Sequence, residues 1–152
     1  MNIFEELTAK IKGTNKKIVF PEGEDKRVLG ACVRLKKDGL VTPIILGNVE
    51  EIKKTAKELN ICIDDIEIID PLKAEDFDEL VEKFVERRKG KNTKEEAETF
   101  LKDVNYYGTM MVQVGKAEGM VSGAVHSTGD TVRPALQIVK TKPNVSRTSG
   151  AM

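Results

Sequence analysis

The stretch Gly119-Met-Val-Ser-Gly-Ala-Val-His-Ser-Thr-Gly-Asp-Thr-Val-Arg-Pro-Ala-Leu-Gln-Ile-Val139 decides the fold that we predict for this chain. It opens on a short apolar run, which indicates a strand at 119–122 that enters a core. Small and hydroxylated residues then fill 122–131. Apolar residues follow at i, i+3, i+4 and i+7, the spacing of a helix, at Val132, Ala135, Leu136 and Val139. A strand, a loop and a helix in this order are frequent in α/β proteins.

The start of this predicted helix has the properties of an anion site. Asp130 or Thr131 can cap the helix, and Pro134 would fall in its first turn, where most backbone N–H groups lack an intrahelical partner. Those N–H groups and the positive end of the helix dipole would face the loop. An ordinary polar turn before a capped helix is the alternative.

The loop and helix also carry side chains that suit a phosphate or an acyl phosphate. They are the hydroxyls of Ser122, Ser127 and Thr128, the imidazole of His126 and the guanidinium of Arg133. His126 is the single histidine, and it is either a structural hydrogen-bonding residue or a donor to an anion. Arg133 would oppose the helix dipole from the first turn, which favours a role in ligand binding. No G-x-S-x-G pattern surrounds the serines, so we predict no nucleophilic serine.

The preceding chain alternates between predicted strands and helices. Strands are expected at 17–20, 43–46 and 66–69, with helices between them, and this β-α-β-α-β order predicts a parallel sheet with helices on both sides. No dinucleotide fingerprint follows the first strand, and no P-loop occurs. We therefore predict one three-layer αβα domain over 1–152, with a mostly parallel sheet.

Residues 74–88 predict an amphipathic helix that runs into the basic segment Arg87-Arg-Lys-Gly-Lys91, with Gly90 as its C′ residue. Four of these five residues are cations. They are either a basic helix end or a site for a phosphorylated ligand, with Arg88 as one contact. Arg27 lies at the start of an earlier predicted helix, either as surface charge or as a ligand contact. Thr93 and Glu96 form a predicted capping box.

Composition narrows the classes of function. The chain has 152 residues with 25 basic and 25 acidic side chains, so its net charge favours neither nucleic acid nor membrane as a partner. Cys32 and Cys62 are expected to be buried reduced thiols, since no metal-ligand spacing is present. We find no signal peptide and no long apolar span, which predicts the cytoplasm.

Residues 121–137 resemble the signature of the phosphate acetyltransferase (phosphotransacetylase) family, of which phosphate butyryltransferases share a looser version. Three further stretches are similar to the acetyltransferase: Ile18-Val-Phe-Pro-Glu-Gly-Glu-Asp-Lys-Arg27, Arg87-Arg-Lys-Gly-Lys91 and Tyr106-Tyr-Gly-Thr-Met-Met111. The resemblance runs through the whole chain, which looks like the first half of a family member.

This resemblance implies an enzyme that moves an acetyl group reversibly between coenzyme A and inorganic phosphate, with acetyl phosphate as a product. The thiolate attacks the acetyl carbonyl directly, and no metal or tightly bound cofactor is implied. Arg88 and Arg133 match arginines implicated in binding coenzyme A or phosphate, and the 122–130 loop matches one wall of the cleft. The family's base, main catalytic arginine and catalytic serine belong to its second half, so residues 1–152 alone are expected to be inactive.

The family fold is a two-domain αβα sandwich related to isocitrate dehydrogenases, and its members are dimers through the second domain. Two alternatives stay open: a butyryltransferase-like enzyme, and a non-catalytic anion- or nucleotide-binding module. No residue is assigned as catalytic, with His126 the sole candidate. The expected substrate-binding set is Arg27, Arg88, Ser122, His126, Ser127, Thr128, Asp130 and Arg133.

Overall fold

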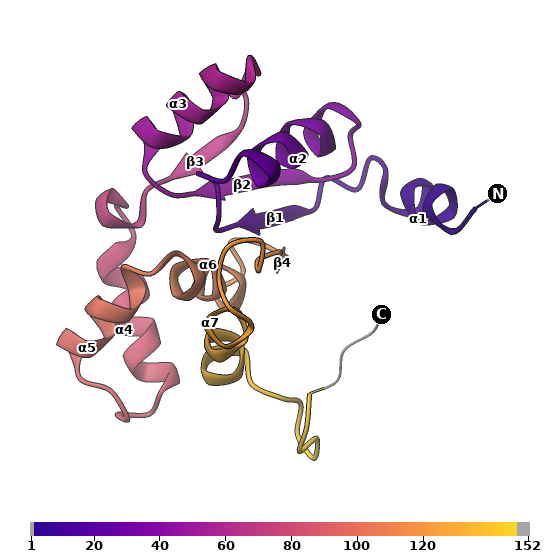
Figure 1. Ribbon diagram of the computed structural model, residues 1–152. Helices are drawn as coiled ribbons and strands as arrows, with labels where there is room; N and C mark the ends of the chain where they lie inside the picture. Colours follow the sequence, from indigo (N-terminus) through magenta and orange to yellow (C-terminus); the bar gives the residue numbers. More distant parts are fainter. Residues whose placement is uncertain (1, 149–152) are drawn as a thin grey trace.

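The computed structural model describes residues 2–148, in which helices alternate with the strands of one sheet (Figure 1). The elements are α1 (Ile3–Ile11), β1 (Lys17–Phe20), α2 (Lys26–Lys37), β2 (Thr42–Leu46), α3 (Val49–Leu59), β3 (Glu67–Ile69), the 3₁₀ turn η1 (Pro71–Lys73), α4 (Phe77–Arg87), α5 (Lys94–Leu101), α6 (Val104–Gln113), β4 (Gly119–Met120), α7 (Thr128–Pro134) and the π-helical turn η2 (Ala135–Val139).

The sheet is parallel and its strand order is β3-β2-β1-β4. Ile18 pairs with Pro43 on one side and with Gly119 on the other, so β1 is central. The chain moves outward from β1 to β3 and then returns to the opposite side of β1. The strands predicted at 17–20, 43–46 and 66–69 are confirmed within one residue, and the one predicted at 119–122 is shorter.

Two apolar cores lie on opposite faces of the sheet, because neighbouring strand residues point to opposite sides. Val19 and Leu46 face α4, α5 and α6, whereas Phe20 and Ile45 face α2 and α3. Figure 1 shows these two helical layers on either side of the strands. The predicted three-layer αβα architecture is therefore confirmed, and burial on both faces explains why the strands show no polar alternation.

Gly108 lets α6 approach the sheet closely. A Cβ atom at this position would lie 2.9 Å from the Met120 sulfur and 3.1 Å from Cγ1 of Val19, both of which belong to the sheet. Such distances are shorter than ordinary packing permits. Glycine at this position thus sets the spacing between α6 and the β1–β4 pair.

Helix termini follow the predictions in one case and differ in another. The capping box of Thr93 and Glu96 at the start of α5 is confirmed. At the end of α4 the C′ residue is Lys89, with φ of 53°, and not Gly90. The Gly90 N–H reaches back to the Val85 carbonyl at 3.5 Å, which places Gly90 one position later in a Schellman arrangement.

Several apolar or thiol side chains are more exposed than the sequence suggests. The stripe of Phe4, Leu7 and Ile11 on α1 is exposed to solvent and contributes nothing to either core. Cys32 is buried as predicted, but the prediction for Cys62 is wrong, because it lies exposed in the segment after α3. Within residues 2–148 no helix is both long and apolar enough to cross a bilayer.

Candidate functional site

The loop after β4 closes around a carboxylate of the protein itself. Backbone N–H groups of Gly123 and Ala124 donate to Oε1 of Glu22, each at 2.8 Å, and those of Val125 and His126 donate to Oε2 at 2.6 and 2.9 Å. The Glu22 side chain is 2% exposed. These four N–H groups are therefore occupied by a side chain of the protein itself.

The His126 ring completes this arrangement, with Nδ1 at 2.8 Å from Oε2 of Glu22. Burial raises the pKa of the Glu22 carboxyl, but hydrogen bonds from the backbone and ring of His126 and from the backbone of Ala124 and Val125 outweigh burial. They lower this pKa from 4.5 to about 2. Glu22 is consequently ionised at neutral pH, and the loop binds an anion supplied from within the chain.

The position of Glu22 in the fold is the one where α/β proteins bind ligands. It lies two residues after β1, at the carboxyl end of the sheet, and the strand order reverses between β1 and β4. Beside it lies a cavity of about 220 Å³, whose walls include Glu22, His126, Pro21, Val104 and Val125. His126 is thus placed at a cavity mouth by a buried partner.

Arg27 braces the same loop from outside. Its Nη2 donates to the Ala124 carbonyl at 3.1 Å, and its Nε and Nη2 both donate to Asp25, at 3.1 and 3.0 Å. The Arg27 guanidinium is the main cause of a lowered pKa of Asp25, which also caps α2. The structure therefore brings Arg27 and His126 to one region, as the predicted set requires.

Ser122 is held by a residue that the sequence analysis did not single out. Its hydroxyl donates to Oδ1 of Asn105 at 2.7 Å, and Nδ2 of Asn105 donates to the Asp130 carbonyl at 3.4 Å. Asn105 is fully buried at the start of α6. It ties both ends of the 122–130 loop to α6.

The helix after the loop begins earlier than predicted. Ser127 is the N-cap of α7, and its hydroxyl exchanges hydrogen bonds with Asp130, so the prediction of Asp130 or Thr131 as the cap is wrong. Thr128 is the first helical residue and is exposed. Pro134 is the last residue of α7 and not part of its first turn.

The position of Arg133 changes for the same reason. It lies beyond the first turn of the continuous helical run that α7 and η2 form, and its Nη1 is 3.7 Å from Oδ1 of Asp130. The unfavourable interaction that we expected between Arg133 and the dipole at the start of the helix is therefore absent. Because the chain continues as a π-helical turn, Pro134 and Ile138 become the buried residues, whereas Leu136 of the predicted stripe is exposed.

The basic segment at the end of α4 divides into a structural and an available part. Arg87 donates to the carbonyls of Ile138 and Val139, at 2.7 and 3.0 Å, and so caps the π-helical turn. Arg88 donates through Nε to Oδ1 of Asn92 at 2.9 Å. The predicted helix-end role therefore belongs to Arg87, and Arg88 keeps donors for a ligand.

Positive charge accumulates around Arg88. The pKa of Lys140 is lowered by partial desolvation and then by the charges of Arg87, Lys89, Lys91 and Arg88. Cations at this density repel one another, and an anion placed among them relieves the repulsion. This surface favours a phosphorylated ligand.

Tyr106 connects the basic segment to α7. Burial raises the pKa of its hydroxyl, while the nearby charges of Arg133 and Arg88 act in the opposite direction. The same hydroxyl donates to Oε1 of Gln137 at 2.8 Å. The charges of Arg88 and Arg133, which are 45 positions apart in the sequence, thus both act on one tyrosine.

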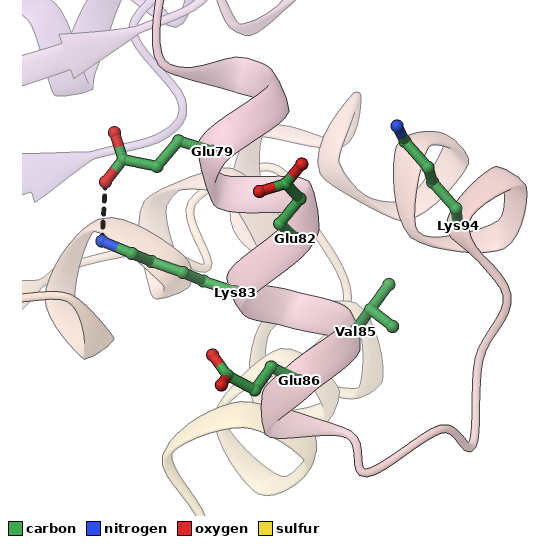
Figure 2. Close-up of a pocket in the computed structure, with 6 residues that line it drawn as sticks. All are labelled: Glu79, Glu82, Lys83, Val85, Glu86 and Lys94. Atoms are coloured by element: carbon green, nitrogen blue, oxygen red, sulfur yellow. Dashed lines mark hydrogen bonds and ion pairs between the residues drawn. The ribbon is translucent and has the colours of Figure 1, made fainter.

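A larger hollow elsewhere has the wrong charge for such ligands. A pocket of about 550 Å³ lies beside α4. Figure 2 shows its lining, in which Glu79, Glu82 and Glu86 outnumber Lys83 and Lys94. The Lys83 ammonium is bound to Glu79 at 2.6 Å. This lining repels anions. Over residues 2–148 no group of three or more His, Cys, Asp or Glu is gathered as a metal site would require.

Known proteins share the sequence of this chain over nearly its whole length. The family model described as phosphate acetyl/butaryl transferase matches residues 2–152. The chain belongs to this family. A curated phosphate acetyltransferase of Staphylococcus epidermidis is 62% identical over 144 residues, and one of Staphylococcus aureus is 59% identical. Each alignment covers 95% of this chain but 44% of the relative, so the chain spans less than half the length of these proteins.

Solved structures of the phosphate acetyl/butaryl transferase family have the same fold. EutD phosphotransacetylase from Staphylococcus aureus superposes with a TM-score of 0.90 at 58% identity, over 96% of this chain and 44% of that one. A phosphotransacetylase from Streptococcus pyogenes gives 0.94 at 57% identity, over 99% and 46%. The resemblance that the sequence motifs indicate is confirmed.

Three residues of the region escaped the sequence reasoning as members of a site. Glu22 lies two residues after an apolar strand. A carboxylate close to the carboxyl end of a central parallel strand indicates a ligand site, so this residue could have been found from the sequence. Asn105 and Tyr106 lie in a segment whose apolar pattern predicts a buried helix. Their polar partners lie more than 15 positions away in the sequence. No local pattern identifies them.

Proposed function

We propose that this chain is the first part of a phosphate acetyltransferase, which transfers an acetyl group reversibly between coenzyme A and inorganic phosphate. The observation that carries the proposal is 62% identity to a protein of that name over 144 residues. The relatives compared are named for acetyl transfer, which favours an acetyl over a butyryl substrate. Coenzyme A acts as a substrate, and neither a metal nor a tightly bound cofactor takes part.

Arg88 and Arg133 are the proposed contacts for the phosphate groups of the substrates. Guanidinium groups form charge-assisted, often bidentate, bonds to phosphate oxygens. Their joint influence on Tyr106 supports a common ligand, and the cations around Arg88 add to the attraction. The loop residues Ser122, His126, Ser127, Thr128 and Asp130, with Arg27 behind them, form the wall of the cleft.

We propose that residues 1–152 are one αβα domain and that the remaining length of the family supplies the opposite wall and the base. The exposed apolar side chains of Val132, Leu136 and Val139 beside Arg133 support this, since a second wall would cover them. The complete enzyme would be a homodimer of the cytoplasm that uses small-molecule substrates, without a nucleic-acid or membrane partner. Residues 1–152 by themselves are expected to show negligible acetyl transfer in a coupled assay.

The proposal is tested by Arg133→Ala in a protein of full family length that carries this chain. Loss of a hydrogen bond to a charged group costs about 1.5–3 kcal/mol, so the Michaelis constant for coenzyme A or acetyl phosphate should rise about tenfold to hundredfold. Arg133→Lys should recover part of the loss, because lysine lacks the planar fork.

Arg34→Ala is the matched control. Arg34 is an exposed arginine on α2, on the opposite face of the sheet, and it forms a similar long ion pair, at 3.6 Å, with Asp38. It should leave both Michaelis constants unchanged. Unchanged kinetics in Arg133→Ala would contradict the site, and a lower melting temperature alone would make Arg133 a structural residue.

A further inference from the structure

The contact between Glu22 and His126 determines which nitrogen of the ring carries hydrogen. Four of the five groups bound to the Glu22 carboxylate are backbone N–H groups, which can only donate. The fifth is Nδ1 of His126, which shares Oε2 with the backbone N–H of its own residue. An ionised carboxylate can only accept, so Nδ1 must be the donor.

We infer that Glu22 is a positioning residue that keeps a hydrogen on Nδ1 of His126, so that in the neutral ring Nε2 is a hydrogen-bond acceptor. A neutral imidazole has one ring hydrogen, and the hydrogen bond at one nitrogen sets the state of the other. Backbone and ring of His126 are anchored to the same oxygen atom, which fixes the ring orientation as well as its tautomer.

The identity of the ligand that would contact Nε2 rests on the proposed function. The lone pair on Nε2 repels a bare anionic oxygen but accepts a hydrogen bond from a protic group. The thiol of coenzyme A and the P–OH group of hydrogen phosphate are both protic. When the ring is neutral, Nε2 therefore selects a protic group, in contrast to the donor role that the sequence suggested for His126.

The neighbouring acidic residues cannot take this role. Glu24, in the same loop, is exposed and accepts one backbone N–H, from Asn48 at 2.9 Å. Asp25 is engaged by Arg27 and by the first turn of α2. Glu22 alone of these three joins the loop after β1 to the loop after β4.

The tautomer can be read directly, because His126 is the single histidine of the chain. A long-range ¹H–¹⁵N spectrum of the substrate-free protein, recorded at a pH where the imidazole is neutral, contains the signals of one imidazole ring. We expect the Nδ1–H form in about tenfold to hundredfold excess, the range for a hydrogen bond to a charged group. Since no substrate is added, the result is separate from that of the acetyl-transfer assay.

Glu22→Gln should reduce the excess of the Nδ1–H form, because a neutral amide oxygen is a weaker hydrogen-bond acceptor than an ionised carboxylate. Glu24→Gln, the same change in the same loop, should keep the wild-type spectrum. An Nε2–H ring in the wild type, or an undiminished excess of the Nδ1–H form in folded Glu22→Gln, overturns the inference. If Glu22→Gln does not fold, the wild-type spectrum decides.

Discussion

Acid should remove a defined part of the stability of this protein through Glu22. The pKa of this carboxyl is about 2 in the folded protein, against 4.5 for an unperturbed glutamate, because the hydrogen bonds from the 123–126 loop outweigh the effect of burial. A group with a lowered folded-state pKa stabilises the fold above its unfolded pKa. The stabilisation is then lost as the pH falls toward the folded-state value.

The size of this effect follows from the shift. A difference of 2.5 between 4.5 and about 2 corresponds to about 3 kcal/mol of unfolding free energy above pH 5. The same linkage leaves about 1 kcal/mol at pH 3 and nearly nothing below pH 2. Glu22→Gln removes the ionisation, so its stability should lack this component at every pH.

Urea unfolding of the wild type and Glu22→Gln, followed by circular dichroism from pH 7 to pH 3, measures the effect. Titrating groups that do not contact Glu22 contribute equally to both proteins, so the difference between their unfolding free energies reports on Glu22 together with its partner His126. It should narrow by about 2 kcal/mol over this range. Glu24→Gln, which alters an exposed carboxylate, should change stability by less than about 0.5 kcal/mol and in parallel with the wild type. If the difference in unfolding free energy between the wild type and Glu22→Gln stayed constant down to pH 3, the reasoning would be refuted.

Three further predictions concern packing, capping and thiol exposure. Gly108→Ala should destabilise the chain by about 1–3 kcal/mol in urea unfolding, since the new Cβ would lie 2.9 Å from the Met120 sulfur; an unaffected midpoint would contradict the close approach. Ser127→Ala should cost about 1 kcal/mol through the lost cap of α7, and its midpoint should stay unchanged if Asp130 were the cap instead. Exposed Cys62 should react with a thiol reagent in the folded chain. Buried Cys32, whose pKa burial raises to about 12, should react after unfolding, and equal rates would show that the core opens.

The sequence by itself determined the order and type of the main elements. The apolar runs at 17–20 and 43–46 contain too few polar residues for a sheet with one wet face, and the helices between them require parallel pairing. The capping box of Thr93 and Glu96 was visible because its two partners are three positions apart. The motifs of 121–137 indicated the family, since they are contiguous in the chain.

The tertiary structure alone decided how the candidate site is held. Glu22 contacts residues 101 to 104 positions away, and most of its partners are backbone N–H groups, which nearly every residue carries and which leave no pattern in a sequence. Ser127, and not Asp130 or Thr131, caps α7 in the folded loop. In the π-helical turn that follows, Ile138 is buried, whereas the sequence predicted that Leu136 and Val139 would be. Local periodicity describes a regular helix, whereas long-range contacts determine where such a helix begins and where it widens.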